Sequence, residues 1–255
     1  MAAGDAGIDG SVAIVTGAGR GLGRHVASAL AARGFPVAAV GRAGSAVDAT
    51  VAAIEAGGGV ALPIHADVLD DGAASDVVRR VEAELGPVGL LVNNAGTMHL
   101  GRIAEIDPDE WWTDFEVNVK ATMRWCQAAL AEMLPRRHGL IVNVASTATQ
   151  WVVPAGSAYI ASKAAVISLT KILAAELRGS GVRAFAFGPW ARTDMTDGLA
   201  TSPAFTAGQR AVFRRIDDAE AERRLRGTLR MLDQIIDGDL DDHLGEYLDS
   251  EAPPR

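Results

Sequence analysis

The strongest constraint on the fold of this chain is a regular alternation of short β-rich runs with longer segments of helical period. The candidate strands are residues 11–16, 36–41, 60–65, 88–93, 139–145, 182–188 and 245–249, and the candidate helices are residues 21–33, 45–56, 71–85, 109–133, 157–178 and 217–237. Alternating strands and helices of these lengths predict βαβ units. We therefore expect an α/β fold, a doubly wound seven-stranded parallel sheet with helices on both faces.

The alternation leaves little room for a second domain. Apolar residues make up 49% of the 255 residues and aromatic residues only 5%, so the core must be aliphatic, as suits a parallel sheet buried on both faces. We expect residues 1–255 to form a single domain. Residues 190–216 interrupt the alternation, and their mixture of aromatic residues with Gly, Pro, Ser and Thr predicts a long substrate loop.

Charge and cysteine content exclude several classes of function. The net charge of −8 argues against a nucleic acid or an anionic membrane as partner. Cys126 is the only cysteine and the five histidines are scattered, so we expect no disulfide and no metal site. No secretory signal and no membrane-spanning stretch is visible, and we expect a cytoplasmic location.

One tyrosine and one lysine predict acid–base chemistry. Tyr159 and Lys163 lie four residues apart in a predicted helix, and the chain has only two tyrosines and three lysines. Positions i and i+4 share a helix face, so the phenol and the ammonium project the same way. A nearby cation favours the phenolate, which moves a group with an ordinary pKa of about 10 toward work at neutral pH. This arrangement indicates catalysis at a carbonyl or an alcohol.

Further motifs lie where the predicted strands end. Thr16-Gly17-Ala18-Gly19-Arg20-Gly21-Leu22-Gly23 follows the first strand, Asp67-Val68 the third, Asn93-Asn94-Ala95-Gly96 the fourth, Ser146 the fifth and Gly188-Pro189 the sixth. Glycines between a strand and a helix let the backbone approach a pyrophosphate. Open α/β sheets bind ligands at this carboxyl edge. We therefore expect a Rossmann-type dinucleotide site there.

From about residue 10 to 249 the chain resembles the short-chain dehydrogenase/reductase family, in general terms its 3-oxoacyl-carrier-protein reductase-like branch. The resemblance implies a catalytic tetrad of Asn118, Ser146, Tyr159 and Lys163. It also implies a nicotinamide dinucleotide bound by Thr16, Gly17, Gly19, Arg20, Gly21, Leu22, Gly23, Arg42, Asp67, Val68, Asn94, Ala95, Gly96, Tyr159, Lys163, Pro189 and Thr193. Family members usually pair through helices that match 109–133 and 157–178, so we expect a homodimer or homotetramer.

The resemblance gives each tetrad residue a role in hydride transfer between the nicotinamide and a carbonyl carbon. Tyr159 donates or accepts the proton of the substrate oxygen, and Ser146 orients that oxygen. Lys163 binds the ribose and lowers the pKa of Tyr159, and Asn118 holds a water of a proton relay. Simpler roles remain open at this stage, since Asn118 could cap a helix kink and Asp67 could serve as a turn residue.

The end of the second strand bears on the choice of cofactor. Family members that use NAD commonly carry an acidic residue there, which binds the ribose 2′-hydroxyl. This chain has Gly41 at that position, with Arg42 and Arg20 placed to meet a 2′-phosphate. Arginine is well suited to phosphate binding, so we expect NADP(H) rather than NAD(H), although both arginines could be merely solvated.

The chain departs from the family pattern after the sixth strand. It has Gly188-Pro189 where the family has Pro-Gly, which could re-aim the turn, and with it Thr193 and Trp190. His99, Trp151 and Val153 are candidate pocket-lining residues.

The sequence thus predicts an NADP(H)-dependent oxidoreductase that interconverts a ketone and a secondary alcohol on a small, largely apolar substrate. Two alternatives are a non-catalytic dinucleotide-binding regulator of the same fold and an epimerase or dehydratase of the same family.

Overall fold

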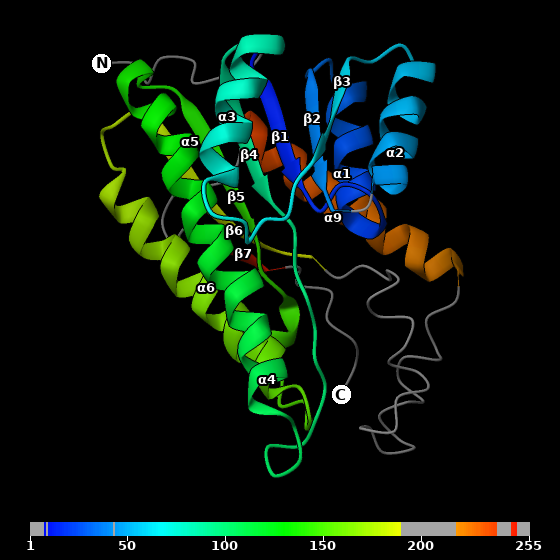
Figure 1. Cartoon of the computed structure of the whole chain (residues 1–255), viewed down its shortest axis with the longest axis vertical. Coiled ribbons are helices and arrows are strands. Elements are labelled where there is room, and N and C mark those ends of the chain that lie inside the picture. Colours follow the sequence, from blue (N-terminus) through cyan, green and yellow to red (C-terminus); the bar gives the residue numbers. More distant parts are fainter. Residues whose placement is uncertain (1–7, 9, 43, 190–217, 239–245, 249–255) are drawn as a thin grey trace.

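The seven predicted strands form one parallel sheet. The computed structural model describes residues 8, 10–42, 44–189, 218–238 and 246–248. The strands are β1 (Val12–Thr16), β2 (Val37–Gly41), β3 (Ala61–His65), β4 (Val88–Asn93), β5 (Gly139–Val144), β6 (Val182–Gly188) and β7 (Glu246–Leu248). Their order is β3-β2-β1-β4-β5-β6-β7, and each neighbouring pair is parallel (Figure 1). The expected fold class is confirmed.

Helices connect the strands and cover both faces of the sheet. They are α1 (Gly21–Ala32), α2 (Gly44–Ala56), α3 (Ala73–Glu84), α4 (Pro108–Phe115), α5 (Thr122–Arg136), α6 (Ser157–Glu176) and α9 (Asp218–Asp237). A π-helical segment, η1 (Glu116–Ala121), joins α4 to α5, and a short 3₁₀ helix, η2 (Thr147–Gln150), follows β5. Most boundaries lie within two residues of those expected from the sequence.

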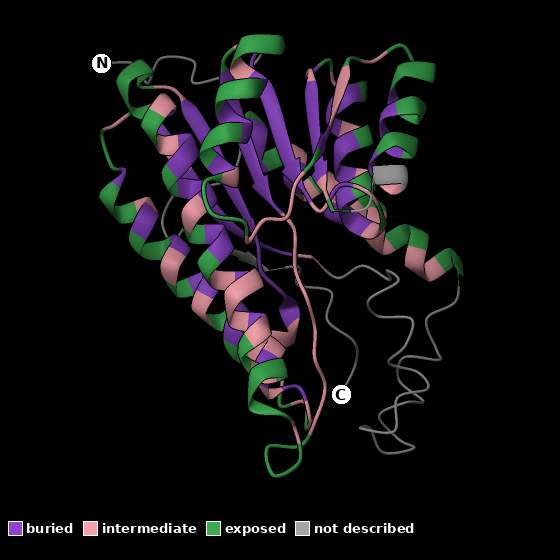
Figure 2. Cartoon of the chain, viewed as in Figure 1, coloured by how far each residue is buried: buried purple, intermediate pink, exposed green. Residues whose placement is uncertain are grey.

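The core has two layers, because successive strand residues point to opposite faces. Ala13 and Val15 of β1 pack with α1, α2 and α9, whereas Val12 and Ile14 pack with α3, α5 and α6. Both sets of strand residues are almost fully excluded from solvent, and the helices bury one side only (Figure 2). The apolar runs of the sequence are therefore explained by burial on both faces of the strands.

The expected continuous helix over residues 109–133 is wrong in one respect. Its start is as predicted, with the Asp107 carboxylate accepting hydrogen bonds from the backbone N–H groups of Asp109 and Glu110, and with Pro108 in the first turn. The helix then widens into η1 for six residues before α5 begins. A π turn adds one residue to the helix repeat, and apolar periodicity does not reveal so local a change.

One described helix, α6, is long and apolar enough to cross a membrane by length and composition alone. This is weak evidence, since a helix that packs in a protein core passes the same test. Its buried residues include Ser162, Lys163 and Thr170, and it packs along β6. The absence of a membrane-spanning helix remains a prediction from the sequence.

Candidate active site at the carboxyl edge of the sheet

The strand order reverses between β1 and β4, so their carboxyl ends flank a topological switch point. The Thr16 side chain ties the two ends together. Its Oγ1 accepts hydrogen bonds from the backbone N–H groups of Asn94 and Ala95, both at 3.0 Å. The Asn94 side chain in turn donates to the backbone oxygens of Thr16 at 2.9 Å and Gly17 at 3.3 Å. The two motifs that the sequence predicted for a dinucleotide thus form one hydrogen-bonded unit.

The glycine turn is too tight for side chains. Gly17 and Gly21 have φ values of +67° and +52°, a region that favours glycine. A Cβ on Gly23 would lie 2.2 Å from the Gly17 oxygen and 2.4 Å from Asn94 Nδ2. Arg20 precedes α1 in an extended conformation and gives no side-chain cap to the helix. The first backbone N–H groups of α1 can therefore face a phosphate, as a dinucleotide requires.

Asn93 has a different environment from Asn94. Its side chain is buried and donates to Asn143 Oδ1 at 2.8 Å and to the Cys126 sulfur at 3.4 Å. Burial raises the pKa of the Cys126 thiol to about 12. The first asparagine of the motif therefore links β4 to β5, and the second holds the glycine turn that follows β1.

Gly41, Arg42 and Asp67 lie together at the ends of β2 and β3. Arg42 Nη1 lies 3.6 Å from Asp67 Oδ2, and the Arg42 side chain is 74% exposed. Asp67 also accepts a hydrogen bond from the Leu69 backbone N–H at 2.9 Å, as a turn-forming aspartate does. Val68 packs partly buried beside the α3 side of the core. The arginine therefore keeps an exposed guanidinium at the carboxyl ends of β2 and β3.

The tetrad residues come from η1, the end of β5 and α6, and the structure brings them together. The Ser146 side chain acts on the Tyr159 phenol and favours its ionised form. Lys163 Nζ lies 5.9 Å from the centroid of the Tyr159 ring and donates to the Val144 backbone oxygen at 2.8 Å. A Cβ on Gly96 would lie 3.5 Å from Lys163 Nζ, so this ammonium also borders the segment that follows β4.

Asn118 is held by the segment after β4 and by α6. Its Oδ1 accepts from the Thr97 backbone N–H at 2.9 Å, and its Nδ2 donates to the Thr97 oxygen at 3.0 Å and to Ser162 Oγ at 2.9 Å. Ser162 Oγ donates to the Tyr159 backbone oxygen at 2.7 Å. Asn118 therefore links η1 to the helix that carries Tyr159 and Lys163. It lies at a widened helix turn, as the alternative of a kink residue suggested.

Burial shifts the pKa of both residues of the Tyr159–Lys163 pair. Burial raises the pKa of the Tyr159 phenol, the Ser146 side chain opposes this rise, and the Asp114 carboxylate adds to it. Burial lowers the pKa of Lys163 from 10.5 to about 8, and Asp114 opposes that change. Removal from water disfavours the charged form of each residue, and the effect of Lys163 on the pKa of Tyr159 stays a prediction from the resemblance.

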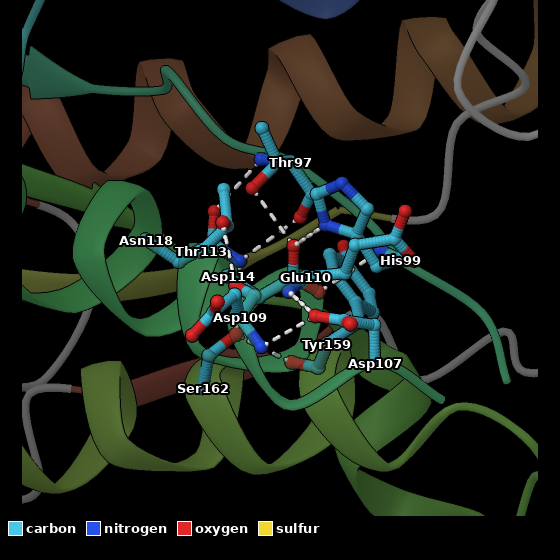
Figure 3. A network of polar contacts seen from close by, with 10 residues as sticks. All are labelled: Thr97, His99, Asp107, Asp109, Glu110, Thr113, Asp114, Asn118, Tyr159 and Ser162. Carbon is cyan, nitrogen blue, oxygen red and sulfur yellow. Dashed lines mark hydrogen bonds and ion pairs between the residues drawn. The ribbon is translucent and has the colours of Figure 1, made fainter. Parts of the chain in front are cut away.

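The structure adds Asp114 and Thr97 to the site. Asp114 is completely buried and accepts hydrogen bonds from Thr97 Oγ1 at 2.8 Å and from His99 Nδ1 at 2.7 Å (Figure 3). The sequence analysis named His99 as a candidate lining residue but missed its partner. The position of Asp114, one helical turn before Asn118, is the signal that could have identified it.

Of the residues expected to act after β6, the structure describes only one. Pro189 follows β6 directly and is partly buried. Thr193, Trp190 and the substrate loop over residues 190–216 lie outside the described residues.

Comparison with known proteins gives the family. The sequence profile of the family described as short chain dehydrogenase matches residues 11–203. A short chain dehydrogenase of Pseudocercospora fijiensis is 42% identical over 184 residues, which are 71% of this chain and 60% of the fungal protein. This chain therefore spans less than two thirds of that relative.

Two further proteins are similar over more of their length. A 3-oxoacyl-(acyl-carrier-protein) reductase of Staphylococcus aureus is 37% identical over 191 residues, covering 74% of this chain and 77% of the relative. A variant of actinorhodin polyketide ketoreductase, solved with NADPH, superposes with a TM-score of 0.84 at 28% identity over 96% of this chain and 97% of its own. The chain belongs to the short-chain dehydrogenase family.

Proposed function

We propose that this protein is an NADP(H)-dependent oxidoreductase that interconverts a ketone and a secondary alcohol. The observation that carries the proposal is the meeting of Ser146, Tyr159 and Lys163 at the sheet edge that also holds the glycine turn. The apolar character expected of the substrate rests on residues 190–216, which lie outside the described chain, and it remains an expectation from the sequence.

The chain's own residues divide the chemistry among them. The nicotinamide, when bound, supplies or accepts the hydride at the substrate carbon. In reduction, the Tyr159 hydroxyl gives its proton to the substrate oxygen while Ser146 donates a hydrogen bond to the same oxygen. A raised pKa keeps Tyr159 protonated at neutral pH, which suits the role of acid. When the proton has been transferred, Tyr159 is a phenolate, and the ammonium of Lys163, one helix turn away, stabilises its negative charge.

The substitution Tyr159→Phe tests the catalytic assignment. It removes the proton donor and keeps the ring, so we expect NADPH-dependent ketone reduction to fall at least about 100-fold while NADPH binding is retained. Reduction is followed by absorbance over a panel of ketones and binding by fluorescence. The matched control is Tyr247→Phe at the only other tyrosine. Turnover that survives in the Tyr159 variant would remove the proposal.

The preference for NADP(H) is supported by Gly41 and by the exposed Arg42 guanidinium near Asp67. We expect the dissociation constant for NADPH to be lower than for NADH. In Arg42→Ala, NADPH affinity should fall about tenfold and NADH affinity should stay unchanged, because only the 2′-phosphate loses a partner. The exposed Arg79 of α3 provides the control Arg79→Ala. Tighter binding of NADH by the unaltered protein would refute the preference.

A further inference from the structure

Asp114 and Lys163 are the two charged residues that are buried within the described chain. Lys163 belongs to the tetrad, whereas Asp114 has no place in it. A buried carboxylate is costly unless its oxygens are fully hydrogen-bonded. Here Oδ1 accepts from Thr97 Oγ1 and His99 Nδ1, and Oδ2 accepts from the His99 backbone N–H at 3.0 Å. The carboxylate therefore fixes both the backbone and the ring of His99.

The fixed imidazole leaves one nitrogen available. With Nδ1 directed at Asp114, Nε2 lies on the opposite side of the ring. The His99 side chain is 34% exposed, although its partner is 0% exposed, and Nε2 makes no hydrogen bond to the residues that the structure describes. The ring is thus held by one nitrogen and presents the other to its surroundings.

The segment that carries His99 borders the candidate active site. His99 lies in the segment after β4, and the next residues of this segment join the loop after Ser146 through a hydrogen bond of 2.9 Å from the Gly101 N–H to the Ala155 oxygen. The Asp114 charge acts on both Tyr159 and Lys163. In Figure 3, Thr97 and His99 converge on Asp114 in the same close-up as Tyr159 and Asn118.

We propose that His99 is a substrate-binding residue, with Asp114 as its positioning residue, and that its Nε2 binds a hydroxyl group that the substrate carries in addition to the reacting carbonyl. A hydroxyl can donate to the lone pair of neutral imidazole and accept from the N–H of imidazolium. A carbonyl or carboxylate oxygen fits only the protonated ring. The inference rests on the proposed function and refines its substrate class to hydroxyketones and the corresponding diols.

The test compares 2-butanone with 3-hydroxy-2-butanone and 4-hydroxy-2-butanone. His99→Asn keeps an amide N–H near the position of Nδ1, so Asp114 retains a donor, and it removes Nε2. We expect the preferred hydroxybutanone to lose about tenfold in kcat/KM relative to 2-butanone in this variant, the effect of one lost hydrogen bond. His138→Asn, at a histidine that contacts Ser11 at the opposite edge of the sheet, is the control. An equal loss for all three ketones would indicate a structural role and overturn the inference.

A binding measurement separates this inference from the proposed function. In the presence of NADP⁺ the ketone of 4-hydroxy-2-butanone cannot be reduced, and its hydroxyl is primary and so outside the proposed activity on secondary alcohols. With this ligand the histidine ring signals of the isotope-labelled protein therefore report binding alone. We expect a hydroxybutanone, and not 2-butanone, to shift the His99 signal, which is assigned by its loss in His99→Asn. The inference fails if no hydroxybutanone shifts that signal or if 2-butanone shifts it equally. The lack of any ketone reduction by the unaltered protein would instead count against the proposed function.

Discussion

Lys163 shows how one buried residue connects catalysis to stability. The side chain is 4% exposed, and its ammonium has the Val144 carbonyl as a hydrogen-bond partner and Asp114 as a favourable charge. Burial still dominates and lowers its pKa to about 8. Keeping a cation at this position therefore costs folding free energy at neutral pH, which is a common property of functional sites.

The pH dependence of unfolding should reveal that cost. Between pH 8 and 10.5 the unfolded chain retains the Lys163 proton and the folded chain loses it, so the free energy of unfolding should rise with pH in this window. The shift from 10.5 to about 8 corresponds to roughly 3 kcal/mol. We expect urea unfolding at pH 7 and pH 10 to show this rise in the unaltered protein and its loss in Lys163→Met.

The exposed Lys171 of α6 offers the matched control, because Lys171→Met removes a lysine from the same helix without removing a buried charge. A pH dependence that is the same in all three proteins would contradict the account of Lys163.

At the level of elements, the turn between β1 and α1 depends on contacts with a segment more than seventy residues away. Gly23 sits in the first turn of α1, and it is the Asn94 side chain and the Gly17 oxygen that exclude a Cβ there. The glycine pattern of the sequence is thus explained by steric contact with a neighbouring strand end as well as by the turn conformation.

Two alanine substitutions distinguish these roles of glycine. Gly23→Ala should lower the free energy of unfolding by more than about 2 kcal/mol and weaken NADPH binding, since the new Cβ collides with backbone. Gly227→Ala in α9 meets nothing within 4 Å, and it should raise stability by about 0.5–1 kcal/mol because alanine favours a helix interior. Denaturant titration and NADPH fluorescence measure both. If Gly23→Ala were as stable as the parent, the close approach would be refuted.

At the level of elements, the π-helical segment η1 is the feature that the sequence pattern did not predict. The spacing of apolar residues predicted one helix over 109–133, and the start signal at Asp107 and Pro108 was correct. The widened turn at Asn118 accompanies side-chain bonds to Thr97 and Ser162, which come from distant parts of the chain. Such bonds leave no trace in local periodicity.

At the scale of the whole molecule, the outer helices α5 and α6 carry large apolar side chains that are exposed to solvent in the single chain. Met123 and Leu134 lie eleven residues apart on α5, which places them on one face, and Ile172 lies on α6. These side chains are 36%, 42% and 59% exposed. Exposed apolar side chains on the outer helices favour protein–protein contact.

We therefore expect the protein to form a homodimer or homotetramer through these helices. Ile172→Glu should shift it toward smaller species in light-scattering-coupled chromatography, because a carboxylate is costly to bury in an interface. Val60, 55% exposed just before β3, gives the control Val60→Glu, which should leave the assembly unchanged. A monomeric parent protein at micromolar concentration would contradict the expectation of a homo-oligomer. The cytoplasmic location, a separate expectation, stays a prediction from the sequence.

The sequence by itself determined the order of strands and helices, the aliphatic two-layer core and the edge of the sheet at which Thr16, Asn94, Ser146 and Pro189 would meet. It could do so because periodicity and turn residues act locally, and because parallel strands place all their carboxyl ends on one side. Only the tertiary structure decided the ionisation of Tyr159 and Lys163 and the pairing of His99 with Asp114. Both depend on exclusion from water and on contacts between distant segments, and neither is written in the spacing of residues along the chain.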